Sequence, residues 1–184
     1  TPVNSIKKGI AFICEDRRRK AMIPSFTVEE NMNLSSIDHY SKKGLFSTTA
    51  AVSAAKGMIN ALKIRCTGTS QPACELSGGN QQKVVIARVF SENPDVIIVA
   101  QPTRGVDVGA MEYIHHRLLD LRDGGKSILL ISADLDEVRS LSDRLAVIYG
   151  GRIVAEGKPD TWSDMEIGLL MTGGSLAPEK EGTA

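Results

Sequence analysis

Apolar residues follow a helical spacing in the first half of the chain and a strand-like spacing in the second. Residues 47–64 are rich in Ala and carry larger apolar residues on one face, which predicts a helix with a weak point at Gly57. Before it, residues 9–13 form a short apolar run that predicts a strand. Thr27 and Glu30 have the spacing of a capping box and predict the start of a short helix. The first half is therefore expected to be mainly helical.

The second half alternates short apolar runs with amphipathic segments. Helices are predicted from about Ser77 to Phe90 and from Val108 to Arg122, the second ending at a Gly-Gly pair. Buried strands are predicted at four places, the last two joined by a Gly-Gly hairpin turn: residues 96–99, 127–131, 145–149 and 152–155. Strand, helix and strand in this order indicate a parallel α/β layer that continues to about Gly157. The tail beyond Thr172 has the composition of a disordered segment.

Composition excludes several classes of protein. With 184 residues, 42% of them hydrophobic, the chain can bury the core of one domain or of a large piece of one. Lys+Arg and Asp+Glu both number 22, so no overall positive field attracts nucleic acid or anionic lipid. No run approaches the roughly 18 apolar residues of a membrane-spanning helix. Three cysteines fit neither a disulfide framework nor a paired zinc motif, so a reducing cytosol is expected, and the opening at Thr1 without Met suggests a fragment.

Residues 76–83 read Leu-Ser-Gly-Gly-Asn-Gln-Gln-Lys and form the most informative segment. Ser77, Gly78 and Gly79 place a hydroxyl and unobstructed backbone N–H groups at the start of a predicted helix. The helix dipole adds about half a positive charge there, which suits a phosphate oxygen. For Ser-Gly-Gly alone, an ordinary N-cap with two flexible glycines would be the better interpretation.

The whole string, followed by residues 84–88 and then a buried strand, resembles the signature helix of ABC ATPases, in the form found in carbohydrate uptake family 2 importers. The resemblance covers about Gly9 to Gly174. It implies an α/β fragment of the P-loop NTPase fold, in which the segment Ser77 to Gly79 contacts the γ-phosphate of an ATP held by a facing domain. The other nucleotide-binding residues that it implies are Gln81, Glu15 and Asp107. It also implies four parts: an incoming core strand and the start of the Q-loop (1–15), a helical subdomain with the signature (16–90), an α/β core (91–157), and a C-terminal helix with its tail (158–184).

Three positions depart from the family pattern. Residues 95–107 resemble its second nucleotide strand and a D-loop that ends at Asp107, but Ala100 and Gln101 stand where that pattern has Asp and Glu. The aspartate normally helps to hold Mg²⁺ and the glutamate handles the attacking water, because a carboxylate accepts a proton and an amide does not. Ala133 stands at the usual switch histidine. We expect no metal ligand here and a degenerate site, although Gln101 could still orient a water for slow turnover.

Two further segments bear on the resemblance. Glu15 stands at the usual glutamine of the Q-loop, which in this family touches the membrane subunit, and the basic residues 18–20 are read as a solvated or interface loop. The chain contains no complete Gly-x-x-x-x-Gly-Lys-[Ser/Thr] phosphate loop; residues 125–127 mimic its end, but Asp120 replaces the first Gly and the segment runs from a helix into a strand. The isolated chain is therefore predicted to be inactive.

The resemblance implies part of the ATP-hydrolysing subunit of a bacterial sugar or nucleoside importer, peripheral to the cytoplasmic face of the plasma membrane. Its cofactors would be ATP and Mg²⁺ in a two-domain subunit. Its partners would be a second nucleotide-binding domain arranged head to tail, membrane permease subunits and, indirectly, a solute-binding protein, without nucleic acid. Residues 100–102 resemble nucleoside importers more than ribose or xylose ones. A nucleic-acid-linked ABC ATPase and a non-catalytic regulatory pairing module remain open alternatives.

Overall fold

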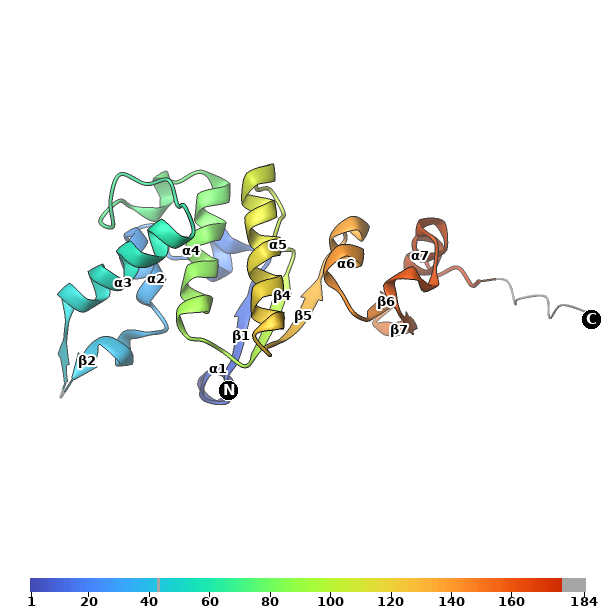
Figure 1. The fold of residues 1–184 in the computed structure, drawn as a ribbon, viewed down its shortest axis with the longest axis horizontal. Helices are drawn as coiled ribbons and strands as arrows, with labels where there is room; N and C mark the ends of the chain where they lie inside the picture. The colour runs from blue at the N-terminus through green and yellow to red at the C-terminus, as the bar shows by residue number, and fades with distance from the viewer. Residues whose placement is uncertain (43, 177–184) are drawn as a thin grey trace, which may run out of the picture. The chain divides into compact units, whose positions relative to one another are not determined.

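The computed structural model describes residues 1–42 and 44–176 and divides the chain into two compact units, 1–131 and 132–184 (Figure 1). Each unit is described by itself. The predicted disordered tail falls mostly on residues 177–184, which lie outside the described residues. The finer division into four functional parts stays a prediction.

The first unit contains a parallel sheet of three strands in the order β1 (Ile10–Ile13), β4 (Val96–Ala100) and β5 (Ser127–Ile131). All three strands run in the same direction, so the predicted parallel α/β layer is confirmed here. One face is buried by Ala11, Ile13, Ile97 and Val99, whereas Phe12 and Leu129 on the other face are 55% and 54% exposed. The expectation that β5 is buried was wrong, because its residues alternate between half-buried and exposed.

Two long helices accompany this sheet: α4 (Gly78–Ser91) packs against β1, and α5 (Val108–Asp123) packs against β5 and α4 (Figure 1). Residues 84–87 of α4 are almost fully buried. On α5 the buried residues Ala110, Ile114 and Leu118 recur every four positions, which is the spacing of one helical face. Both helices were predicted, and their first turns carry the candidate site.

The other helices of this unit form a layer beside α4. Helix α2 (Val28–Asn33) begins with the predicted capping box: Glu30 N–H donates to Thr27 Oγ1 at 3.1 Å, and Thr27 N–H donates to Glu30 Oε2 at 2.8 Å. Helix α3 (Thr48–Ala61) runs through Gly57 without a break. Both pack on α4 around a shared apolar core. The shorter elements are α1 (Pro2–Lys7), the π-helical turn η1 (Arg17–Ala21), the 3₁₀ turns η2 (Ile37–Tyr40) and η3 (Ala73–Glu75), β2 (Ser41–Lys42) and β3 (Leu45–Phe46).

The second unit is built on an antiparallel hairpin of β6 (Leu145–Tyr149) and β7 (Arg152–Gly157), with α6 (Leu135–Leu141), η4 (Pro159–Thr161) and α7 (Asp164–Met171). The predicted Gly-Gly turn is confirmed, because Gly150 and Gly151 have φ of 56° and 75°. The expectation that these strands continue a buried parallel layer was wrong. They form their own two-stranded sheet, and most of β7 is exposed, because only one face of the hairpin packs on α7.

In the described part of the chain, no helix is long and apolar enough to cross a bilayer. Cys14, Cys66 and Cys74 are free thiols.

Candidate functional site

The first turn of α4 carries the predicted phosphate-binding residues. Ser77 is the N-cap residue, with extended φ and ψ of −60° and 156°, and it is exposed. Among the described residues its hydroxyl caps no N–H group of the helix. The N–H groups of a first helical turn have no acceptor within the helix, so this tip keeps several donors for an outside acceptor.

Gly79 allows the tip of α4 to approach the start of α5 closely. A Cβ at this position would lie 2.9 Å from Asp107 Oδ2, which is too close for any other residue without a shift. The Asp107 carboxylate is held in place because its Oδ1 accepts the N–H of Ala110 at 2.9 Å and so caps α5. The structure therefore brings Asp107 next to the glycine-bearing turn of α4.

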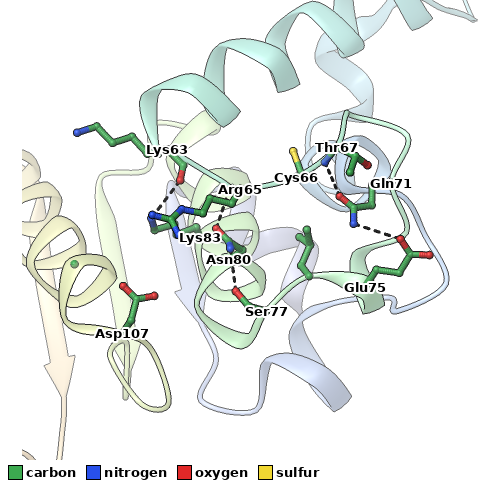
Figure 2. Close-up of a pocket in the computed structure, with 12 residues that line it drawn as sticks. Lys63, Arg65, Cys66, Thr67, Gln71, Glu75, Ser77, Asn80, Lys83 and Asp107 are labelled. Atoms are coloured by element: carbon green, nitrogen blue, oxygen red, sulfur yellow. Dashed lines mark hydrogen bonds between the residues drawn. The ribbon is translucent and has the colours of Figure 1, made fainter.

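A hollow of about 980 Å³ opens beside this turn (Figure 2). Its walls are the connector 63–67, the segment 71–77, the first turns of α4 and the start of α5. Three cations and two carboxylates line it: Lys63, Arg65, Lys83, Glu75 and Asp107. With the positive end of the α4 dipole at its edge, the hollow has the charge to accept an anion such as a phosphate group.

Hydrogen bonds tie the connector to α4. Asn80 Nδ2 donates to Ser77 Oγ at 2.9 Å, and the Arg65 backbone N–H donates to Asn80 Oδ1, also at 2.9 Å (Figure 2). One turn further along, Lys83 Nζ donates to the Lys63 carbonyl at 3.4 Å. Sequence analysis missed the roles of Asn80 and Lys83. The spacing of Ser77 and Asn80, three apart on a helix, was the available signal.

Lys83 also lies over the ring of Tyr113 on α5, 5.8 Å from the ring centroid. Burial raises the pKa of the Tyr113 phenol; the nearby Arg117 cation lowers this pKa by a smaller amount, and the Asp120 carboxylate raises it further. The phenol therefore stays neutral near pH 7, and its ring adds a cation–π contact that holds Lys83 at the wall of the hollow.

Gln81, which the sequence placed among the nucleotide contacts, has a different position. Its side chain is 2% exposed, and its Nε2 donates to the carbonyls of Ala73 and Leu76 at 3.2 and 3.1 Å. The amide lies inside the domain and supports the segment that leads into Ser77, which argues against a direct contact with a nucleotide. Without this amide the two carbonyl oxygens would be buried without these donors, which costs free energy.

Ala100 and Gln101, the two residues that depart from the family pattern, lie at the end of β4, where the backbone of Gln101 is unusual. Gln101 has φ of 50°, a left-handed conformation, and its N–H donates to the Ile131 carbonyl at 2.8 Å. Such a conformation costs a non-glycine residue on the order of 1–3 kcal/mol. Ala100, the residue before it, pairs with Ile131 in the parallel register. The turn is therefore held by main-chain pairing to β5.

Glu15 follows β1 and lies at the same carboxyl edge of the sheet, because Ile13 pairs with Val99. Its carboxylate forms an ion pair with Arg104, in the turn after Gln101; both side chains are at least half exposed. Ala133 is exposed and belongs to the second unit. Glu15, Ala100 and Gln101 thus gather at one edge.

The residues at this edge do not fit Mg²⁺. The ion prefers carboxylate and phosphate oxygens, whereas Ala100 supplies no ligand and Gln101 supplies one amide oxygen. In residues 1–42 and 44–176, no three His, Cys, Asp or Glu side chains gather in a way that could hold a metal. We therefore derive no metal-dependent step on this chain.

The imitation phosphate loop at residues 125–127 follows a helix, as predicted. Gly124 caps the end of α5 through its N–H, and Gly125 has φ of 85°. Lys126, which lies between α5 and β5, pairs its Nζ with Oδ1 of Asp95, the residue before β4, at 3.1 Å. The Lys126 charge therefore joins two loops of the domain.

Comparison with known proteins gives a consistent family. Residues 1–104 match the family described as ABC transporter. The nucleoside import ATP-binding protein NupA of Lactococcus lactis is 42% identical over 177 residues, which cover 95% of this chain and 35% of that protein. The guanosine import ATP-binding protein NupO of Bacillus subtilis is also 42% identical, covering 94% and 34%.

A ribose import ATP-binding protein, RbsA of Streptococcus agalactiae, is 38% identical, with coverage of 95% and 35%. The chain thus spans about a third of the length of these curated relatives. Among solved structures, the dimeric ATP-binding cassette MJ0796, in a post-hydrolysis state with ADP and Pi, is similar with a TM-score of 0.70 and 26% identity, covering 83% of this chain and 64% of that one.

Proposed function

This chain belongs to the ABC transporter family, and on that premise we propose that it forms part of the ATP-binding subunit of a bacterial importer for a nucleoside or a sugar. The relatives at 42% identity are named for nucleoside and guanosine import, and those at 38% for ribose or xylose. This difference favours a nucleoside as the solute.

One observation carries the proposal: the α4 tip offers donors without an acceptor of its own. Ser77 is an exposed N-cap whose hydroxyl caps nothing among the described residues, and Gly79 keeps the first turn free of a side chain. The adjoining hollow carries more cations than carboxylates. These features suit the terminal phosphate of an ATP presented by a facing nucleotide-binding domain.

In this arrangement the chain binds the γ-phosphate and stabilises the charge that develops on it. The facing domain supplies the phosphate loop and the catalytic carboxylates. The Ser77 hydroxyl and the N–H groups of Gly78 and Gly79 would donate to γ-phosphate oxygens. Preorganised donors aimed at developing charge are a major source of rate enhancement in such reactions. ATP would enter bound to Mg²⁺ on the facing domain.

The chain's own nucleotide edge would bind ATP and hydrolyse it slowly or not at all. Gln101 cannot accept a proton as a glutamate does, and Ala100 offers no oxygen to a metal. The subunit would therefore have two unequal sites. It would act at the cytoplasmic face of the membrane through permease subunits and, through these, with a solute-binding protein.

The proposal is tested with Ser77→Arg in the intact subunit reconstituted with its permease. A long cation at the tip would block the approach of the phosphate, so transport-coupled ATP hydrolysis should fall to background. Ser53→Arg, an exposed serine on α3, is the matched control and should retain the parent rate. An unchanged rate in Ser77→Arg would remove the tip from the ATP site.

A further inference from the structure

We propose that Asn80 is a positioning residue that sets the direction of the Ser77 hydroxyl proton. The proposal rests on the proposed function, because it concerns how the α4 tip meets a phosphate. It is carried by two hydrogen bonds, from the Arg65 backbone N–H to Asn80 Oδ1 and from Asn80 Nδ2 to Ser77 Oγ.

The first of these bonds fixes the orientation of the Asn80 amide. A backbone N–H can only donate, so the atom of Asn80 that lies 2.9 Å from Arg65 N must be the oxygen. The amide nitrogen then faces Ser77 Oγ at 2.9 Å, and it too can only donate. No flip of the amide keeps both bonds.

The second bond decides what Ser77 can do. Its oxygen accepts from Asn80, so its own hydrogen must point away from Asn80. The residue is exposed, and among the described residues the hydroxyl serves no N–H group of α4. Among the described residues the proton has no recorded acceptor, so it is left for an acceptor outside them, such as a phosphate oxygen.

The partner of Asn80 is itself held by the backbone of the connector. Lys63, two residues before Arg65, has φ of 48°, and its carbonyl accepts from Lys83 Nζ at 3.4 Å. Asn80 and Lys83 therefore anchor the connector 63–65 to one face of α4, as Figure 2 shows. A well-fixed connector gives Asn80 Oδ1 an N–H donor in a fixed position, and this fixes in turn the direction in which Asn80 Nδ2 donates to Ser77.

The test substitutes Asn80→Asp in the intact, reconstituted subunit. Aspartate has the same shape and still accepts from Arg65, but its second oxygen would draw the Ser77 proton inward. We expect Asn80→Asp to lose as much ATPase rate as Ser77→Ala, about 10- to 100-fold for a hydrogen bond to a charged group. Asn80→Ala frees the hydroxyl and also removes the acceptor of the Arg65 N–H, and it should lose about 3- to 10-fold.

The double variant Ser77→Ala/Asn80→Asp separates positioning from charge repulsion. If Asn80 acts through the serine, the double variant should be no slower than Ser77→Ala, a full departure from additivity. A further loss would mean that the new carboxylate simply repels the phosphate, and the proposal would be wrong. Asn60→Asp, an exposed amide on α3, controls for added charge, and melting temperatures confirm that each variant folds.

The outcomes also distinguish the two proposals. If Ser77→Ala and Ser77→Arg both leave the rate unchanged, the tip is not part of the ATP site and both proposals fail. If Ser77→Arg abolishes the rate while Ser77→Ala leaves it unchanged, the tip stays in the ATP site and only the role of Asn80 is overturned. If Ser77→Ala is slow while Asn80→Asp and Asn80→Ala are as fast as the parent, only the role of Asn80 is overturned.

Discussion

The first turn of α4 and the end of β4 both lie where a nucleotide-binding fold places chemistry, yet they differ in what they retain. The α4 tip keeps an exposed hydroxyl, two glycines and a hollow with three cations. The β4 end has a methyl group at Ala100 and an amide at Gln101. One region has the groups that suit a phosphate, and the other has neither a carboxylate to hold a metal nor a carboxylate to accept a proton.

The comparison separates backbone geometry from side-chain chemistry at the end of β4. Gln101 adopts a left-handed φ of 50°, and its N–H pairs with β5, although neither Ala100 nor Gln101 carries a carboxylate. At the α4 tip, the proposed phosphate contact depends on backbone N–H groups and on glycines without side chains, so few substitutions would preserve it. A site made of carboxylates can lose them while the turn that carried them persists.

The comparison predicts opposite results for the same substitution in two helices. At Gly79, an added Cβ would push Asp107 from its cap on α5, so Gly79→Ala should lower the free energy of unfolding by about 1–2 kcal/mol. At Gly57, a Cβ meets no heavy atom of the described residues within 4 Å, so Gly57→Ala should raise it by about 0.5–1 kcal/mol.

Urea unfolding of both variants measures the change in the free energy of unfolding, and the ATPase rate should fall only in Gly79→Ala. A double-mutant cycle with Asp107→Ala measures the coupling between residues 79 and 107. Once the Asp107 carboxylate is gone, Gly79→Ala should cause little further destabilisation. If Gly79→Ala is stabilising, the close approach of the two helix tips does not constrain the turn.

A substitution at the end of β4 should change the free energy of unfolding but not the rate of ATP hydrolysis. Gln101→Gly relieves the left-handed backbone and should raise the free energy of unfolding by about 1 kcal/mol. Asn93→Gly, at φ of 46°, is the control: because Asn tolerates this conformation, its gain should be only a few tenths of a kcal/mol. ATP hydrolysis by the intact subunit should change little with Gln101→Gly. A collapse of the rate would make this end catalytic and overturn the asymmetry.

The sequence predicted those parts of the fold in which local signals agree. The capping box of α2, the glycine end of α5 and the Gly-Gly turn between β6 and β7 each depend on a few neighbouring residues, and all were found where expected. The parallel order of β4 and β5 followed from the helix between them. The burial of β5 and β7 was predicted wrongly, because a run of apolar residues does not indicate which face of a strand other elements will cover.

The candidate site was predictable only in outline. Ser77 and Gly79 came from the signature segment and Asp107 from the D-loop segment, and the structure places Asp107 next to Gly79. Gln81 was assigned to the ligand because it belongs to the same string, but its side chain lies inside the domain. The role of Asn80 depends on Arg65, fifteen positions earlier, and a pattern read along one helix does not contain such a pairing.

The smallest expected effect concerns what holds the β4 edge together. If main-chain pairing fixes this turn, the exposed ion pair between Glu15 and Arg104 should contribute little, and Glu15→Gln should cost less than about 0.5 kcal/mol at low salt and less again at high salt. Arg104 has further interactions, so the pair energy needs a double-mutant cycle with Arg104→Met. The pair of Asp95 with Lys126, whose side chain is only 18% exposed, is the matched comparison and should show the larger coupling. A Glu15–Arg104 coupling that exceeds the Asp95–Lys126 value would mean that side-chain charge still organises this edge, and the contrast between a retained backbone and lost chemistry would have to be withdrawn.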